Sequence, residues 1–405
     1  MRHLWLLLLL PAYACTVPCP GMPGPTPVHR GVGVDGHDWD SLETYITDEL
    51  EGSCIPSLSV AIVTPEETLW SAAFGWADIE SAVAASPDTV YMLASVSKTW
   101  TAAALMLAVE DGAVALDDRV SKHVPFKVEN PLLGGNQPPM RVAHLASHTS
   151  GIQDNWDEIP YRKGDPAGTL KGYLRSYLTE NGDRYHAGDN FHPWEPGTAY
   201  SYSNVATALA GLTVQEAVGQ PFEDYCAERL FTPLGLETTH WFLRDFDADT
   251  PMAVPYEVDR DGWVPREHYG YPTWPDGQLR TTASELARFL GMVMAGGTWD
   301  GVQVMAPETV DAMLRSPLTG AAGPAPSSVT DGQYVFWGDA RKGRIGHNGG
   351  DPGVHTRLYF DPQTEVGVVM LTNFGSFKLG LDPVFAFNQV EDRLFEVGAD
   401  VRRSR

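Results

Sequence analysis

The chain has 405 residues, of which 52 are acidic and 28 are lysine or arginine, so its formal net charge is −24. Nucleic acids and anionic lipid surfaces are bound through lysine and arginine, and this acidity therefore argues against both as partners. The contribution of a high net charge to solubility is sufficient to explain this acidity. The length suits one large domain or two lobes that share a site.

The first residues predict an export signal. Residues 1–14, MRHLWLLLLLPAYA, contain a basic residue, an apolar run too short to span a bilayer and a small-x-small cleavage pattern. Cys15 follows directly and raises a second possibility, a lipoprotein anchored through Cys15, although the bulky Tyr13 disfavours that processing. We therefore expect an exported protein, periplasmic or extracellular, with a lipid tether as the alternative.

The remainder of the chain predicts a spacer and one folded body. Residues 15–37 are rich in proline and glycine and are typical of a flexible linker. The folded body then covers about residues 38–400. No other stretch approaches the roughly 20 continuous apolar residues of a transmembrane helix.

The four cysteines indicate no metal site. None of them has the spacing to another cysteine or to histidine that a zinc site requires, so we expect neither a metal nor another cofactor. An exported location permits a disulfide between Cys54 and Cys226. Two buried free thiols are an equally weighted alternative.

The predicted elements place strands near both ends of the chain. A helical pattern at residues 38–51 is followed by an alternating apolar and polar pattern at 58–78, which predicts a β-hairpin. A second hairpin is predicted at 354–374 and a last helix at 381–397. Helical patterns between the two hairpins cover residues 101–112, 202–219 and 281–297.

This order of elements predicts an α/β (α+β) fold. A mixed antiparallel sheet, assembled from both ends of the chain and flanked by helices, carries a mostly helical inserted lobe. We expect the sheet lobe to contain about residues 38–94 and 280–400. The helical lobe would contain about residues 95–279.

Ser95 and Lys98 form the first candidate site, in the sequence SVSK. Positions i and i+3 of a helix share a face, so the hydroxyl and the amine come within hydrogen-bond reach. Desolvation would lower the pKa of Lys98 and let the amine help to deprotonate Ser95. The alternative is an ordinary helix cap, because serine is common at that position and S-x-x-K is a weak pattern.

A second segment, Tyr202-Ser203-Asn204, precedes a predicted helix. If it is extended, the side chains of Tyr202 and Asn204 project to the same side. Tyr202 could then move a proton between Ser95 and a leaving group, and the amide of Asn204 could hold a substrate carbonyl. A loop that merely caps the helix is the alternative.

A third segment, GRIGHNGGDPG, places His347 before the glycines Gly349 and Gly350. Glycines let a ligand approach the backbone closely. A backbone N–H near Gly350 could therefore donate to an oxyanion together with that of Ser95. A glycine-rich turn between strands is the alternative interpretation.

Together these segments resemble the serine β-lactamase and penicillin-binding protein superfamily, in its class C-like branch with D-alanyl-D-alanine carboxypeptidases, D-aminopeptidases and esterases. The resemblance covers nearly the whole folded body. It rests on SVSK (95–98), YSN (202–204), HNG (347–349), HLASHTSGI (144–152) and PLGLETT (233–239).

The resemblance implies both a fold and a set of residue roles. The family fold is a mixed antiparallel sheet with flanking helices and a helical lobe. Ser95 would be acylated, Lys98 and Tyr202 would share the general-base and general-acid roles, and Asn204 would contact the substrate amide. The third motif, with His347, Gly349 and Gly350, would line the far wall of the site.

The third motif departs from the β-lactamase pattern. It reads His-Asn-Gly where β-lactamases usually carry Lys-Thr-Gly, so a fixed cation is replaced by a side chain that is largely neutral near pH 7. This weakens the case for a dedicated β-lactamase. The leading prediction is a secreted serine hydrolase for D-amino-acid peptides or small esters, with β-lactams as a side activity. The alternatives are a β-lactamase proper and a penicillin-binding or scaffold protein without efficient turnover.

Overall fold

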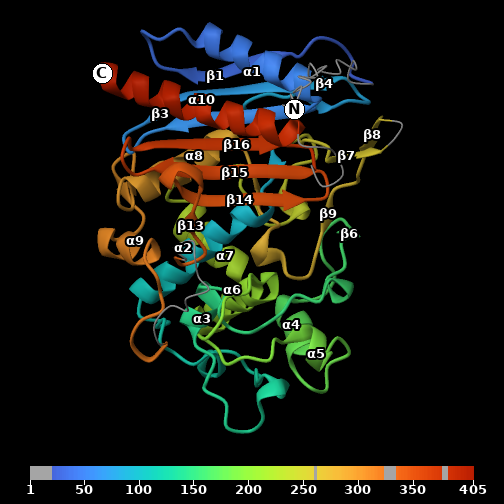
Figure 1. Ribbon diagram of the computed structural model, residues 1–405, viewed down its shortest axis with the longest axis vertical. Helices are drawn as coiled ribbons and strands as arrows, with labels where there is room; N and C mark the ends of the chain where they lie inside the picture. Colours follow the sequence, from blue (N-terminus) through green and yellow to red (C-terminus); the bar gives the residue numbers. More distant parts are fainter. Residues whose placement is uncertain (1–20, 260–261, 323–333, 376–381) are drawn as a thin grey trace, which may run out of the picture.

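The structure is a computed structural model that describes residues 21–259, 262–322, 334–375 and 382–405. The predicted signal, residues 1–14, and Cys15 lie outside these ranges. Strands gather at one end of the molecule and the helical middle of the chain at the other (Figure 1). Within the described ranges, no helix has both the length and the apolar content to cross a membrane.

The main sheet is built from both ends of the chain, as predicted. Its order is β1-β3-β2-β16-β15-β14-β13, with β4 paired to β3, and neighbouring strands are antiparallel. The two halves meet where β2 pairs with β16. The strands are β1 (Val28–Gly33), β2 (Ser57–Val63), β3 (Thr68–Asp78), β4 (Val83–Ala84), β13 (Gly338–Asp339), β14 (Ile345–Asp351), β15 (Val354–Asp361) and β16 (Val366–Thr372).

Helices cover both faces of this sheet because the strands are apolar on both sides. Along β2, Val60 and Ile62 pack with the helices α1 (Trp39–Ser53) and α10 (Asp382–Ser404). Ala61, between them, points to the other face and joins the core that contains α8 (Ala283–Met294). Successive side chains of a strand point to opposite faces, so one strand serves both cores.

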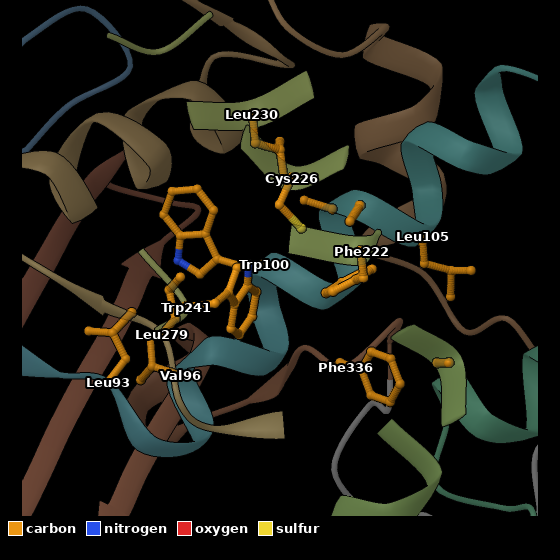
Figure 2. Packing of buried hydrophobic residues seen from close by; sticks show 14 of the residues in the cluster. Leu93, Val96, Trp100, Leu105, Phe222, Cys226, Leu230, Trp241, Leu279 and Phe336 are labelled. Atoms are coloured by element: carbon orange, nitrogen blue, oxygen red, sulfur yellow. The ribbon is translucent and has the colours of Figure 1, made fainter. Parts of the chain in front are cut away.

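The helical region is centred on α2 (Ser97–Glu110) and α6 (Asn204–Val218), which contact each other. Both are apolar on all sides and nearly wholly buried, which is typical of central helices. Trp100 of α2 lies in one cluster with Phe222 and Cys226 (Figure 2). The other helices are α3 (Val142–Ala146), α4 (Leu170–Leu178), α5 (Ala187–Asn190), α7 (Phe222–Cys226) and α9 (Pro307–Met313).

Short two-stranded pairs connect these parts. The pair that matters for the site joins β5 (Tyr91–Met92) to β10 (Arg280–Thr281), because the first candidate motif follows β5 directly. The remaining short strands are β6 (Arg162–Lys163), β7 (Tyr256–Asp259), β8 (Gly262–Pro265), β9 (Tyr269–Gly270), β11 (Thr298–Trp299) and β12 (Val302–Gln303).

Two sequence-based expectations are wrong. Within the expected spacer of residues 15–37, residues 28–33 form the edge strand β1, whose backbone pairs with β3. An edge strand forms backbone hydrogen bonds with a neighbouring strand on one side only. Pairing with β3 is therefore enough to order this short stretch, although it contains two glycines. Neither alternative for Cys54 and Cys226 holds: Cys226 is a free, buried thiol, so the two do not pair, and Cys54 is disulfide-bonded, so they are not two free thiols.

Candidate active site

Ser95 lies in a tight turn between β5 and α2. Residues Ala94–Val96 form a 3-10 turn, η1, that runs directly into the first turn of α2, where Lys98 is located. Ala94 has a φ of 48°, a left-handed conformation that costs free energy for a residue other than glycine. The side chain of Ser95 stays partly exposed, whereas Lys98 is completely buried. The turn therefore presents the hydroxyl to solvent and the amine to the interior.

The amine of Lys98 is the centre of the site. Its Nζ donates to Ser95 Oγ at 3.1 Å, to Asn204 Oδ1 at 2.6 Å and to the backbone carbonyl of Asp276 at 2.8 Å. An Asp276 carboxylate oxygen lies 3.4 Å away. The three N–H groups of the Lys98 ammonium thus have three hydrogen-bond acceptors, which hold the amine in one position.

The second motif reaches the same amine from the start of α6. Ser203 is extended, with φ −143° and ψ 121°, and its side chain caps α6 by accepting from the N–H of Ala206. Tyr202 and Asn204 therefore project to one side, as expected. The ring centroid of Tyr202 lies 4.9 Å from Lys98 Nζ, and 37% of Tyr202 is exposed. Tyr202 can thus face a ligand while Asn204 holds the lysine.

Two side chains outside the three motifs hold this segment in place: Asp154, which is half-buried, and His148, which is buried. Asp154 accepts hydrogen bonds from the backbone N–H groups of Asn204 and Val205 and from the Ser203 hydroxyl. His148 Nδ1 accepts from the Ser203 N–H at 3.1 Å, and its ring stacks on Tyr202 at 4.4 Å. Together they satisfy the free donors of the helix N-terminus and fix the tyrosine ring.

The third motif forms β14, whose outer edge passes the Ser95 turn. β13 pairs only with Ile345 and Gly346, so in the described part of the chain residues 347–351 have a strand neighbour on one side alone. Gly349 packs directly on the turn, because an added Cβ would lie 2.3 Å from the Leu93 carbonyl oxygen and 3.1 Å from the Ala94 Cβ. The glycine lets β14, including Gly350, approach the serine closely.

Neighbouring charges determine the protonation of Lys98. Burial alone lowers the pKa of Lys98, but Tyr202 and Asp276 oppose it, and the pKa is raised above its ordinary value. Burial also raises the pKa of Tyr202, against the opposing effect of Lys98. The expectation of a lowered Lys98 pKa is therefore wrong, because Tyr202 and the Asp276 carboxylate together outweigh the effect of burial. At neutral pH the pair is therefore an ammonium and a phenol.

The third motif supplies no positive charge. Burial, and then the neighbouring Lys98, lower the pKa of His347 to about 4, so the imidazole is neutral at pH 7. Its ring lies 6.1 Å from that of Tyr202. Burial likewise holds the pKa of His148 well below its usual value. Lys98 is accordingly the cation of the site, and among the described residues no group of three or more histidine, cysteine or acidic side chains could hold a metal ion.

Two buried carboxyl groups, those of Asp276 and Asp351, lie at the site. Asp351 accepts hydrogen bonds from the hydroxyls of Tyr161 at 2.7 Å and Tyr271 at 3.0 Å. Burial raises its pKa to about 7. It is two residues from Gly349 along β14, so the alternation of the strand places it on the same side as His347. Asp276 and Asp154 could not be identified as site residues from the sequence. Neither belongs to a recognisable motif, and each is brought next to the motifs only by the fold.

One protein-family match spans all three motifs. The family described as Beta-lactamase matches residues 42–382, which is most of the chain. The chain belongs to the β-lactamase family. The match includes all seven candidate residues: Ser95, Lys98, Tyr202, Asn204, His347, Gly349 and Gly350.

Individual relatives are distant. Protein flp of Staphylococcus aureus strain MW2 is 24% identical over 341 residues, covering 83% of this chain and 63% of flp, so the chain spans less than two thirds of that relative. D-amino acid amidase of Ochrobactrum anthropi SV3 has a TM-score of 0.69 at 22% identity, covering 90% of this chain and 100% of the amidase. Beta-lactamase/D-alanine carboxypeptidase of Pseudomonas syringae has a TM-score of 0.65 at 21% identity, covering 88% and 99%. These structures share the fold.

Replacement of Gly349 by alanine tests the close approach of β14 to the serine. The new methyl group would collide with the Leu93 carbonyl oxygen, which is backbone and cannot rotate away. We expect Gly349→Ala to slow acylation of Ser95 about 100-fold, because displacement of reacting groups by about 1 Å costs that much. Gly52→Ala, where no atom lies within 4 Å of the added Cβ, is the matched control. A normal acylation rate in Gly349→Ala would show that the contact is dispensable.

Proposed function

We propose that this chain is an exported serine hydrolase that forms an acyl-enzyme at Ser95 and acts on amides or esters. D-amino-acid peptides and small esters are the first substrates to expect. The observation that carries the proposal is the position of Lys98 Nζ, 3.1 Å from Ser95 Oγ and 2.6 Å from Asn204 Oδ1. A buried amine in contact with a partly exposed serine hydroxyl is the arrangement that activates a nucleophile.

The proposed reaction assigns roles to Ser95, Lys98, Tyr202, Asn204 and the β14 edge near Gly350. Ser95 Oγ attacks the substrate carbonyl carbon, and the Lys98–Tyr202 pair accepts the hydroxyl proton. The pair then delivers that proton to the leaving nitrogen or oxygen, and water hydrolyses the acyl ester. Since Asn204 Oδ1 already accepts from Lys98, the side chain of Asn204 has N–H groups to donate to a substrate carbonyl. Backbone N–H groups of Ser95 and of the β14 edge near Gly350 are assigned to the oxyanion.

The charge of the site favours substrates without a carboxylate. His347 is neutral, and Asp276 and Asp351 lie on the same site. Arg280 is buried and donates to the backbone carbonyls of Gln278 and Tyr269, so it is already engaged. Among the described residues of the site, a substrate carboxylate would meet no cation besides Lys98, which already contacts Asp276, and the charged forms of the two aspartates would repel it. The fold shared with a D-amino acid amidase supports amides as one substrate class.

A matched pair of substrates tests the proposal. A peptide ending in D-alanyl-D-alanine and the same peptide with a C-terminal amide differ by one charge. We expect the amide to be hydrolysed at least about tenfold faster, equivalent to ~1.4 kcal/mol. A chromogenic cephalosporin and a p-nitrophenyl ester complete the panel, with turnover and intact mass followed over time.

The outcomes separate the alternatives. Preference for the free carboxylate, or fastest turnover of the cephalosporin, would replace the proposal with a carboxypeptidase or a β-lactamase proper. A persistent adduct without turnover would indicate a penicillin-binding protein. Absence of any adduct and any turnover would refute the hydrolase.

A further inference from the structure

Asp276 contacts the catalytic amine with two different groups. It is the last residue of a 3-10 turn, η7 (Trp274–Asp276), that contacts both α2 and α6. Lys98 Nζ donates to its backbone carbonyl at 2.8 Å, and one carboxylate oxygen lies 3.4 Å from the same nitrogen. Any residue could supply the carbonyl, whereas only an acidic residue supplies the second contact.

Among the described residues, Lys98 is the cation that contacts the buried carboxylate of Asp276, and the Thr273 side chain is its other polar partner. Only 7% of the side chain is exposed, and Oδ1 has no hydrogen-bond partner among the described residues. Burial of a carboxylate with so few partners is costly, and an apolar residue at a buried ion-pair position is often equally or more stabilising, so stability alone does not account for this side chain. Its position against the amine suggests an effect on Lys98 instead.

The other carboxylates near Lys98 have donors of their own. Asp154 accepts from the N-terminus of α6, and Asp351 accepts from Tyr161 and Tyr271. The titratable and charged groups that face or surround Lys98 are Tyr202 before α6, Asp154 and His148 from the loop after α3, His347 and Asp351 from β14, and Asp276 from η7. Asp276 is the carboxylate of this set in contact with the amine.

We propose that Asp276 is a positioning residue that acts through Lys98. Its carboxylate holds the amine between Ser95 and Asn204 and favours the ammonium form, so that the Lys98–Tyr202 pair releases its proton only at alkaline pH. This inference rests on the proposed hydrolase function and adds a control on the pH at which that function operates.

The direction of the expected pH effect follows from the sign of one charge. A negative carboxylate raises the pKa of a neighbouring amine or phenol, so its removal lowers both. The rising limb of the acylation rate against pH then moves to lower pH, whichever member of the pair gives up the proton. Burial, opposed by Lys98, raises the pKa of Asp276 to about 6, so above that pH the carboxylate is charged and exerts its effect.

The test is the pH profile of Ser95 acylation by an uncharged fluorophosphonate in the full chain. Asp276→Asn keeps the backbone carbonyl and removes the charge. We expect its rising limb to move down by about 1 to 3 pH units, the range for an opposite charge within about 4–6 Å. Asp276→Glu restores a carboxylate and should return the midpoint toward that of the wild type. Asp165→Asn is the matched control, because Asp165 accepts from the N–H groups of Leu243 and Arg244 instead.

The outcomes distinguish this inference from the function on which it rests. If the wild type is acylated and Asp276→Asn has an unchanged midpoint, the inference is wrong and the hydrolase stands. If the wild type is not acylated at any pH, both fall. Should Asp276→Asn fail to fold, the wild type still decides: a midpoint below about pH 7 would show that the amine is not held as an ammonium, and a midpoint well above it would support the proposal.

Discussion

Lys98→Ala should slow acylation of Ser95 by about 10³- to 10⁴-fold, because it removes the proton acceptor and the contact that orients the serine. Lys98 Nζ is the only atom that joins Ser95, Asn204 and Asp276 in the described structure. The variant loses all three contacts at once. The measurement is the second-order rate of labelling by a fluorophosphonate, with thermal unfolding followed in parallel because the lysine is buried.

An exposed lysine provides the matched control for this variant. Lys122 forms an ion pair with Asp118 on the surface, and Lys122→Ala should label like the wild type. Lys98→Met keeps much of the side-chain volume and separates loss of the amine from loss of packing. Normal labelling of a folded Lys98→Met protein would exclude the amine from the reaction.

The second large effect is expected for Tyr202→Phe, which removes a single hydroxyl. The ring can keep its stacking on His148, and Tyr202 is partly exposed, so the variant should fold normally. Loss of the proton shuttle should reduce kcat/KM for an amide by about 10²- to 10⁴-fold. An activated ester should lose less, because its leaving group needs no proton.

The comparison of amide with ester is therefore the informative readout. Tyr173→Phe, whose hydroxyl donates to the Glu158 carbonyl away from the site, controls for removal of a phenol. Equal losses for both substrates would place Tyr202 in activation of the serine alone. No loss for either would remove Tyr202 from the mechanism.

The local parts of the site could be predicted from the sequence because their spacing is short. Ser95 and Lys98 are three residues apart, and Tyr202 and Asn204 are two apart, so helix and strand geometry place each pair on one side. The hairpins of β2 with β3 and β15 with β16 were predictable for the same reason. The Pro/Gly-rich composition of residues 15–37 concealed β1, whose order depends on pairing with β3.

The electrostatics of the site could not be predicted, since they arise from contacts between distant parts of the chain. Asp276 lies 178 residues from Lys98 in the sequence. Desolvation alone predicted a lowered pKa for Lys98, and Tyr202 and Asp276 together reverse that direction. Asp154 likewise reaches Asn204 across 50 residues. Such partners are visible only once the fold places them together.

Membership of the β-lactamase family leaves the substrate open, because function on a shared fold depends on the residues around the nucleophile. The proposed preference for substrates without a carboxylate rests on the neutral His347 and on Asp276 and Asp351. The substrate pair that differs only in its terminal carboxylate addresses this feature. The result of that substrate comparison does not depend on which residue is the nucleophile.

The nucleophile itself is tested most directly by mapping a covalent adduct. The wild type and Ser95→Ala are treated with a fluorophosphonate, and intact mass and peptide mapping locate the label. The account predicts one adduct per wild-type chain, on Ser95, and none on Ser95→Ala. Equal labelling of Ser95→Ala, or an adduct on another residue of the wild type, would contradict it.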